Sequence, residues 1–307
     1  IQSALGNDVE INYAKGCHTY KFLPAIPTNL FKGSEGFKVE FYDGQEFEGS
    51  PIETKVLKGN KFWAMGGFGL DIVAQSKRPS LSVRFTAELQ PKFSGEYDFE
   101  IFSIGPSKLS INSERLIDNW TSQEPGEAFF GMGSAPKRGK VNFDEGQSYH
   151  LEVEYKWEGR FPAVQIGMQA PDQLDLMQEA SNLAQESDAV ILVVGTNSDW
   201  ETEGNDRSSL ELPLNQNELI QKVCSLNKNT VVVLNTGSPC EMPWVDEANS
   251  ILQCWFPGQE FGNSLADILF GKTNPSGKLP TTFPKTLPDT PAYSSYPGKD
   301  LQMDYEE

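Results

Sequence analysis

The sequence predicts an α/β domain, with a mostly parallel sheet covered by helices on both faces, that is interrupted by an inserted antiparallel β-sandwich. From about residue 37 to 168, apolar residues alternate with polar ones between turns, which is typical of antiparallel strands with one solvated face. After Pro171, solid apolar runs alternate with amphipathic helical patterns, as in a parallel sheet. We therefore expect residues 1–34 and 170–307 to form the α/β domain and residues 35–169 to form the β-sandwich.

The clearest strands of the predicted β-sandwich have apolar side chains at every second position. These runs are LSVRFTAEL (81–89), GEYDFEI (95–101) and SYHLEVEY (148–155). Each is bounded by Gly, Pro, Asn or Ser, which are the residues that turns favour. Many short strands of this kind indicate two packed sheets.

The predicted α/β domain begins with DVEINYAKG (8–16), which we expect to be one strand of the parallel sheet. A helix follows Pro171, because Leu176, Met177, Ala180 and Leu183 share one helical face. The remaining elements alternate between buried strand and helix: AVILVVG (189–195), a helix over 214–226, TVVVLNTG (230–237), SILQCWF (250–256) and the helix EFGNSLADILFG (260–271).

Composition excludes several classes of function. With Lys plus Arg 25 and Asp plus Glu 43, the net charge is −18, which argues against a nucleic-acid partner. No apolar run approaches the ~18 residues of a membrane span. The two histidines, His18 and His150, are too few for most histidine-based metal sites or a serine triad, and no GxGxxG pattern occurs. We therefore expect no metal and no cofactor, and a chemistry carried by carboxylates.

The four cysteines lack CxxC spacing and lie in or beside apolar runs, so we expect them to be buried and unpaired. No signal peptide is visible, which favours a cytoplasmic location, although the N-terminus looks like the end of a truncated helix. The oligomeric state is left open.

The loop after the first parallel strand of the 170–307 region is the strongest candidate site. Residues 196–207 hold four acids and Trp200, and function collects at the carboxyl ends of strands in such sheets. A sugar site would use the indole ring as a platform and a carboxylic acid to protonate a glycosidic oxygen. The alternative is a solvated acidic loop in an acidic protein, and the loop alone does not decide between them.

Longer motifs resemble a known family. VGTNSDWETEGNDRSSLELP (194–213), NTGSPCEMPW (235–244) and the segment from QCWFPGQEFGNS to KLPTTFP (253–284) are similar to the C-terminal α/β-sandwich domain of glycoside hydrolase family 3 β-glucosidases. The β region resembles the protective-antigen-type insert of a subset of these enzymes, through GFKVEFYDG (36–44), FSGEYDFEIFSIGPSKLSIN (93–112) and LIDNW (116–120).

In that family the nucleophile is an aspartate on a separate (β/α)8 barrel, and the acid/base glutamate comes from the α/β-sandwich loop. The resemblance makes Glu201 the first choice for the acid/base and Glu203 the second, and the sequence does not separate them. The acid must be held protonated, which partial burial and nearby carboxylates favour. We expect Asp206 and Arg207 to pin the loop through an ion pair, and Trp200 to contact substrate.

The family's insert leans over the mouth of the active site, which implies a preference for short glucosides. Phe129 and Phe130, between glycines at a predicted loop tip, are candidate substrate contacts, with core packing as the alternative. The resemblance thus implies the acid/base part of a retaining β-glucosidase that acts together with a barrel segment. The alternative is a non-catalytic carbohydrate-binding or adhesion protein built on the insert.

Overall fold

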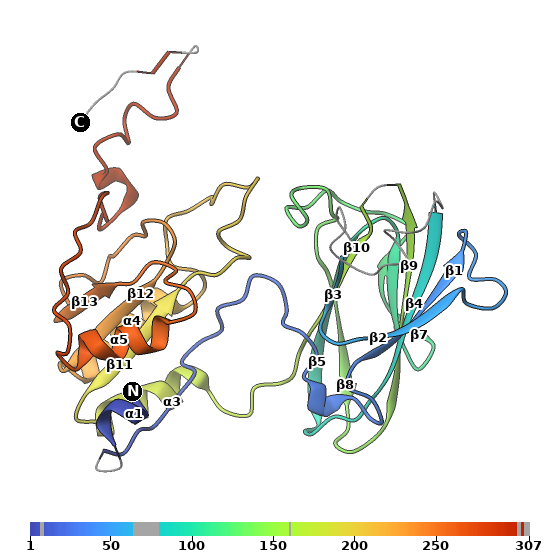
Figure 1. Ribbon diagram of the computed structural model, residues 1–307, viewed down its shortest axis with the longest axis horizontal. Helices are drawn as coiled ribbons and strands as arrows, with labels where there is room; N and C mark the ends of the chain where they lie inside the picture. The colour runs from blue at the N-terminus through green and yellow to red at the C-terminus, as the bar shows by residue number, and fades with distance from the viewer. Residues whose placement is uncertain (7–8, 64–79, 160, 300–301, 304–307) are drawn as a thin grey trace. The chain divides into compact units, whose positions relative to one another are not determined.

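The computed structural model describes residues 1–6, 9–63, 80–159, 161–299 and 302–303. The chain divides into two compact units (Figure 1). One, here called the α/β unit, consists of Ile1–Thr19, Asp172–Thr202 and Asp206–Glu307. The other, the β unit, consists of Tyr20–Pro171 together with Glu203–Asn205.

The α/β unit is built on a three-stranded parallel sheet in the order β11-β12-β13. Its strands are β11 (Val190–Gly195), β12 (Thr230–Asn235) and β13 (Ser250–Gln253), with Val190 opposite Thr230. The helices are α1 (Gln2–Leu5), α3 (Leu176–Glu186), α4 (Gln216–Leu226), α5 (Phe261–Leu269) and the 3-10 turn η2 (Leu287–Asp289). The predicted mixed α/β character of this region is confirmed.

The core of the α/β unit explains why these segments fold as they do. Val232 and Leu234 of β12 are buried, and Ile220 of α4 and Trp244 pack into the same cluster. Helix α3 starts where Asp175 accepts a hydrogen bond from the Gln178 backbone N–H (3.0 Å), a cap that stabilises a helix by about 1 kcal/mol. None of the helices in the described ranges is long and apolar enough to cross a membrane.

The predicted strand over residues 8–16 is wrong for the described residues 9–16, which are assigned to no strand. The side chains that were to pack on the sheet are exposed: Val9 43%, Ile11 42% and Tyr13 83%. A period-two pattern becomes a strand only where a neighbouring strand supplies hydrogen bonds. Only the end of the segment packs, since Cys17 belongs to the core of the unit.

The cysteine prediction is confirmed. All four cysteines are free, with Cys17, Cys224 and Cys240 buried and Cys254 partly buried. Three of them, Cys17, Cys224 and Cys240, belong to the apolar core of the α/β unit, where a thiol packs as a small hydrophobe.

The β unit contains two antiparallel sheets that share one hydrophobic core. The first has the order β2 (Glu53–Leu57), β1 (Phe37–Asp43), β4 (Ser80–Leu89), β9 (Tyr149–Glu158), β6 (Ser107–Ile111), β7 (Glu114–Asn119). The second has the order β3 (Lys61–Trp63), β10 (Ala163–Gln169), β5 (Gly95–Ile104), β8 (Lys137–Phe143), and the 3-10 turn η1 (Thr28–Leu30) precedes β1.

On several strands of this unit the apolar positions of the alternating pattern are buried, whereas β10 and the second half of β5 are buried on both faces. On β4, Leu81, Val83 and Phe85 are at most 1% exposed, and on β5, Tyr97 and Phe99 are equally buried. Each large side chain buried in this way stabilises the fold by roughly 1.5–3 kcal/mol relative to leaving it exposed.

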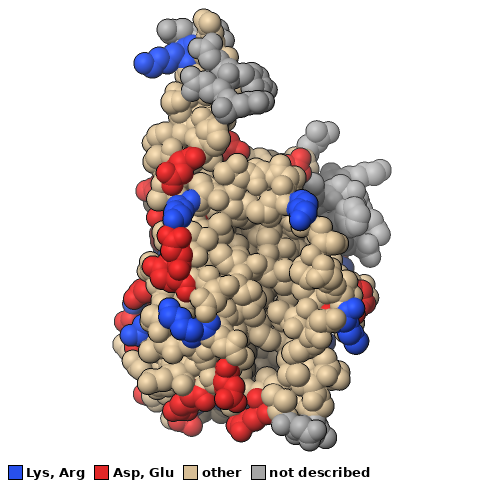
Figure 2. Space-filling view, turned by 90° about the vertical axis from the view of Figure 1, so that its left-hand side faces the viewer, with Lys and Arg blue, Asp and Glu red and all other residues tan. Residues whose placement is uncertain are grey.

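The acid excess of the sequence is visible at the surface. Figure 2 shows Asp and Glu side chains gathered along one margin and at the lower end of the face that is drawn. Among the described residues on that face, Lys and Arg form no patch of the kind that binds a phosphate backbone.

Candidate active site at the carboxyl edge of the parallel sheet

The loop that follows β11 turns back sharply toward the sheet. The backbone carbonyl of Asn197 accepts hydrogen bonds from the N–H groups of Trp200 (3.0 Å) and Glu201 (2.9 Å). The side-chain oxygen of Asn197 accepts a third hydrogen bond, from the Asp199 N–H (2.9 Å). This turn brings the side chain of Glu201 back to the end of the strand from which the loop starts.

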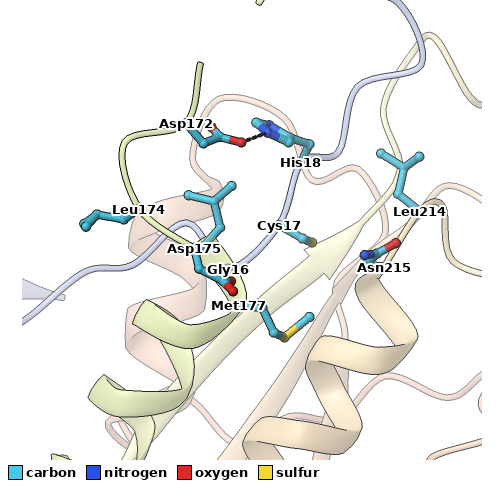
Figure 3. A pocket seen from close by; sticks show the side chains of 10 residues that line it. Gly16, Cys17, His18, Asp172, Leu174, Asp175, Met177, Leu214 and Asn215 are labelled. Atoms are coloured by element: carbon cyan, nitrogen blue, oxygen red, sulfur yellow. Dashed lines mark hydrogen bonds and ion pairs between the residues drawn. The ribbon is translucent and has the colours of Figure 1, made fainter. Parts of the chain in front are cut away.

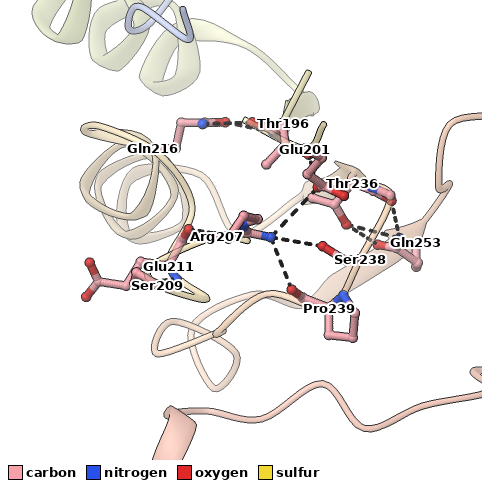
Figure 4. A network of polar contacts seen from close by, with 12 residues as sticks. Thr196, Glu201, Arg207, Ser209, Glu211, Gln216, Thr236, Ser238, Pro239 and Gln253 are labelled. Carbon is pink, nitrogen blue, oxygen red and sulfur yellow. Dashed lines mark hydrogen bonds and ion pairs between the residues drawn. The ribbon is translucent and has the colours of Figure 1, made fainter. Parts of the chain in front are cut away.

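The carboxylate of Glu201 lies between the ends of two neighbouring strands (Figure 4). Its Oε1 accepts a hydrogen bond from the hydroxyl of Thr196, the residue directly after β11. The same oxygen accepts a second hydrogen bond from the N–H of Gly237, which lies beyond the end of β12 (3.2 Å). Arg207 Nη1 is 3.7 Å from the same oxygen, and the Glu201 side chain is only 13% exposed. The partial burial expected of an acid/base group is thus present at Glu201.

Arg207 is fixed by the loops around it. Its Nη1 donates to Ser238 Oγ (3.1 Å) and to the Pro239 carbonyl (3.4 Å), and its Nη2 donates to the Glu211 carbonyl (2.9 Å). The expectation that Arg207 pins the loop through an ion pair holds, but its carboxylate partner is Glu201. A charged side chain held by three fixed acceptors places its charge in one position.

Gly237 leaves room for the carboxylate. A Cβ atom at this position would stand 2.7 Å from Glu201 Oε2 and 2.7 Å from the Phe256 ring. Both distances are shorter than any real Cβ contact, so a side chain here would force the carboxylate or the ring to move. The carboxylate and the ring therefore occupy the space that a side chain at position 237 would need, which explains why this residue is a glycine.

Behind Arg207 lies the thiol of Cys240, which is 0% exposed. Burial raises the pKa of this thiol to about 11, with a smaller opposing effect of the Arg207 charge and a smaller reinforcing effect of Glu201. The neutral thiol thus stays protonated beside the ion pair and acts as packing.

The structure treats the two glutamate candidates differently. Glu203 is exposed, and it belongs to the short stretch Glu203–Asn205 that is grouped with the β unit. Within that unit, Asn205 Nδ2 donates to the Glu127 carbonyl (2.8 Å). Trp200 is partly buried, and its Nε1 donates to the Thr19 carbonyl (2.8 Å), which orients the indole ring.

Phe129 and Phe130, the candidate substrate contacts, also differ. Phe129 is partly buried and packs against Phe102, with ring centroids 5.5 Å apart, so core packing accounts for it. Phe130 is 42% exposed and lies 5.9 Å from Trp63, which is 37% exposed. Sequence reasoning missed Trp63, the last residue of the short strand β3, because no local pattern indicates that its ring lies beside Phe130.

Thr196, Gly237, Gln216 and Gln253 are further residues of the site that sequence reasoning did not single out. The available signal is the position of Thr196 and Thr236, each directly after a strand of the parallel sheet. The glutamines come from α4 and β13, and no local pattern indicates what they contact.

A pocket of about 390 Å³ opens elsewhere in the α/β unit (Figure 3). It is lined by Cys17, Asp175, Met177 and Leu214, and on its rim His18 Nε2 lies 2.7 Å from Asp172 Oδ2. None of the predicted site residues lines it. Cys17, expected to be buried and unpaired, is one of the lining residues.

Comparison with known proteins places these features in context. Residues 54–307 match the family model described as the glycosyl hydrolase family 3 C-terminal domain. A β-glucosidase of Rhizobium radiobacter is 36% identical over 319 residues, which cover 100% of this chain and 37% of that protein. Beta-glucosidase B of Emericella nidulans is 34% identical over 313 residues, covering 97% of this chain and 36% of that protein.

Among solved structures, the chain is similar to the β-glucosidase of Kluyveromyces marxianus in complex with glucose. The TM-score is 0.81 at 31% sequence identity, and the match covers 96% of this chain and 36% of that one. This chain thus spans little more than a third of the length of the curated relatives that it matches.

Proposed function

Because this chain belongs to the glycosyl hydrolase family 3 C-terminal domain family, we propose that it is the acid/base-bearing part of a retaining β-glucosidase. The enzyme would hydrolyse terminal β-D-glucosyl residues of short glucosides. The relatives named β-glucosidase extend well beyond the matched region, which supports a separate barrel segment that supplies the aspartate nucleophile.

The observation that carries the proposal is the setting of Glu201 at the carboxyl edge of the sheet. Its Oε1 is occupied by the Thr196 hydroxyl and the Gly237 N–H, with Arg207 beside it. Because Oε1 already accepts hydrogen bonds from these donors, a proton on Oε1 would face their hydrogens. We therefore assign the exchangeable proton of the carboxyl group to Oε2. Glu203 is exposed and lacks this setting, which supports Glu201 as the acid/base.

The chemistry follows from this assignment. Glu201 transfers the proton of Oε2 to the glycosidic oxygen while the barrel aspartate attacks the anomeric carbon, so the C–O bond breaks and the alcohol leaves. The Glu201 carboxylate then takes a proton from water, the water oxygen attacks the anomeric carbon, and the aspartate leaves. Two displacements retain the β configuration.

We assign the β unit, expected from the sequence at residues 35–169, to a protective-antigen-type β-sandwich insert that starts at Tyr20, because Ile26 and Leu30 belong to its core. The α/β-sandwich domain, expected at 1–34 and 170–307, then consists of residues 1–19 and the chain from Asp172 onward. The two antiparallel sheets around one core support this assignment. In the insert, Phe130 contributes a substrate contact through its exposed ring, while Phe129 packs against Phe102. In the α/β unit, Trp200 provides a sugar platform.

The test combines this chain with the barrel segment and measures hydrolysis of an aryl β-glucoside. We expect activity only when both are present, and full activity of this chain alone would contradict the proposal. In the combined enzyme, Glu201→Ala should lose hydrolysis and produce β-glucosyl azide when azide is added, because azide attacks the glycosyl-enzyme without needing a base. Glu203→Ala is the matched control and should stay close to the parent enzyme.

If Glu203→Ala instead showed the azide product, the assignment would pass to that residue. If no combination hydrolysed a glucoside while the chain still bound glucan, the non-catalytic alternative would be favoured.

A further inference from the structure

The ends of the two strands beside Glu201 are each held by a glutamine side chain (Figure 4). Gln216, the first residue of α4, is 0% exposed. Its Oε1 accepts from the Gly195 N–H (2.7 Å), and its Nε2 donates to the carbonyls of Gly195 (2.9 Å) and Pro213 (3.0 Å). One side chain thus engages both polar backbone groups of the last residue of β11.

Thr196, directly after that residue, has little freedom. Its backbone N–H donates to the Asn235 carbonyl (3.1 Å), and its side chain is 7% exposed. Gly195 packs so tightly that a Cβ there would lie 2.0 Å from the Asn235 carbonyl oxygen. With the backbone fixed on both sides, the Thr196 hydroxyl is aimed at Glu201 Oε1.

The end of β12 carries the same kind of arrangement. Gln253 Nε2 donates to the carbonyl of Thr236 (3.1 Å) and to its hydroxyl (3.2 Å), and Thr236 is 0% exposed. The next residue is Gly237, whose N–H donates to the same oxygen of Glu201. Each glutamine therefore fixes the segment that supplies one hydrogen bond to the carboxylate.

We propose that Gln216 and Gln253 are positioning residues for Glu201, acting through the strand-end donors Thr196 and Gly237. This inference rests on the proposed acid/base role of Glu201. The glutamate side chain has three rotatable bonds, and Arg207 supplies charge but only at 3.7 Å. The two strand-end hydrogen bonds decide where Oε2 points, and a displacement of ~1 Å can lower a rate by roughly 10²-fold.

The test compares two variants, one at each end of α4, in the enzyme combined with its barrel segment. Gln216→Met keeps the length of the side chain and removes three hydrogen bonds to backbone at the site. Asn227→Leu is the matched control, because Asn227 also makes three such bonds, with Ala184, Ser187 and Asn229, beyond the other end of the helix.

The readout is kcat/KM for two substrates that differ in their need for a proton. Methyl β-glucoside has a poor leaving group and depends on acid catalysis, whereas 2,4-dinitrophenyl β-glucoside does not. We expect Gln216→Met to lower the first value by about 10–100-fold and the second by less than about 3-fold. Asn227→Leu should change both values by the same factor.

Thr196→Val keeps the proposal testable if Gln216→Met does not fold, because it removes only the hydroxyl that reaches Glu201. It should also lower kcat/KM for methyl β-glucoside more than for 2,4-dinitrophenyl β-glucoside. Equal effects on both substrates in Gln216→Met, or no discrimination by Thr196→Val, would overturn the positioning role. If Glu201→Ala itself failed to discriminate, the acid/base assignment would be the part that fails.

Discussion

Gly237 and Glu201 lie so close together that a Cβ on the glycine would stand 2.7 Å from Glu201 Oε2. The two residues come from loops that follow different strands, and the Gly237 N–H also donates to the other carboxylate oxygen (3.2 Å). The backbone at position 237 thus donates a hydrogen bond to one carboxylate oxygen, and the other oxygen occupies the space that a side chain at this position would need.

Gly237→Ala should therefore damage the site more than the fold. The new methyl group meets Glu201 and the Phe256 ring, so we expect Oε2 to be displaced and kcat/KM on a poor leaving group to fall about 10–100-fold. Gly262→Ala, in α5, is the control because a Cβ there has no heavy atom within 4 Å. The control should keep full activity and gain roughly 0.5–1 kcal/mol of stability in urea unfolding. Equal activity of both variants would show that the close approach is without consequence.

Cys240 should make the stability of the chain fall at alkaline pH. Burial raises the pKa of the folded thiol from 9.0 to about 11, so the folded state holds a proton that the unfolded state releases first. This contribution is fully present below about pH 9 and is lost as the pH rises toward 11, by roughly 2 kcal/mol.

The measurement is the free energy of unfolding in urea at several pH values between 8 and about 11, for the parent chain and Cys240→Ala. The variant starts lower because it leaves a cavity, but its decline with pH should be shallower. Burial also raises the pKa of Cys17, Cys224 and Cys254, so part of the decline remains. Parallel curves would contradict the prediction.

The sequence was informative where structure depends on local pattern. Alternation over 81–89 predicted the buried face of β4, and helical periodicity placed α3 over residues that begin at Leu176. The same reasoning failed for residues 9–16, because exposure of Tyr13 and its neighbours depends on whether a partner strand lies beside them.

The same distinction between local sequence pattern and contacts distant in sequence applies to the candidate site. The family resemblance of the acid-dense loop pointed to Glu201 first and Glu203 second, but the hydrogen bonds of Glu201 depend on residues distant in sequence. Gly237 lies 36 positions away, and Gln216 lies 21 positions from Gly195. Such contacts arise from the packing of α4 and β12 against β11. No spacing rule reveals them in a single sequence.

In the β unit, Glu100 is a fully buried acid whose two partners differ in exposure. Its Oε1 accepts from the Leu23 N–H (2.8 Å) and its Oε2 from Arg138 Nε (2.8 Å), while the Arg138 side chain is 54% exposed. Removing the arginine leaves a buried charge with one donor. We therefore expect Arg138→Ala to cost roughly 2 kcal/mol, less than the loss of a wholly buried pair.

Urea unfolding distinguishes this from an ordinary surface effect. Lys140→Ala on the same strand removes a cation that pairs with the exposed Glu96, and it should change stability much less than Arg138→Ala does. Glu100→Gln keeps an acceptor for Leu23 and removes the buried charge, so it should cost about 1 kcal/mol. An Arg138→Ala effect no larger than that of Lys140→Ala would refute the argument.

Phe129 and Phe130 should separate stability from substrate binding. Phe129 packs on Phe102 (5.5 Å between centroids), so Phe129→Ala should cost roughly 2 kcal/mol in urea unfolding. Phe130 is 42% exposed, and Phe130→Ala should change stability by less than about 0.5 kcal/mol.

With the barrel segment present, we expect Phe130→Ala to raise KM for an aryl β-glucoside about 3–10-fold, because an aromatic face is lost. Phe93→Ala removes a ring of similar exposure (46%) from the same unit and should leave KM unchanged. A KM equal for Phe130→Ala and Phe93→Ala would remove Phe130 from the substrate contacts and leave it as one exposed ring among others.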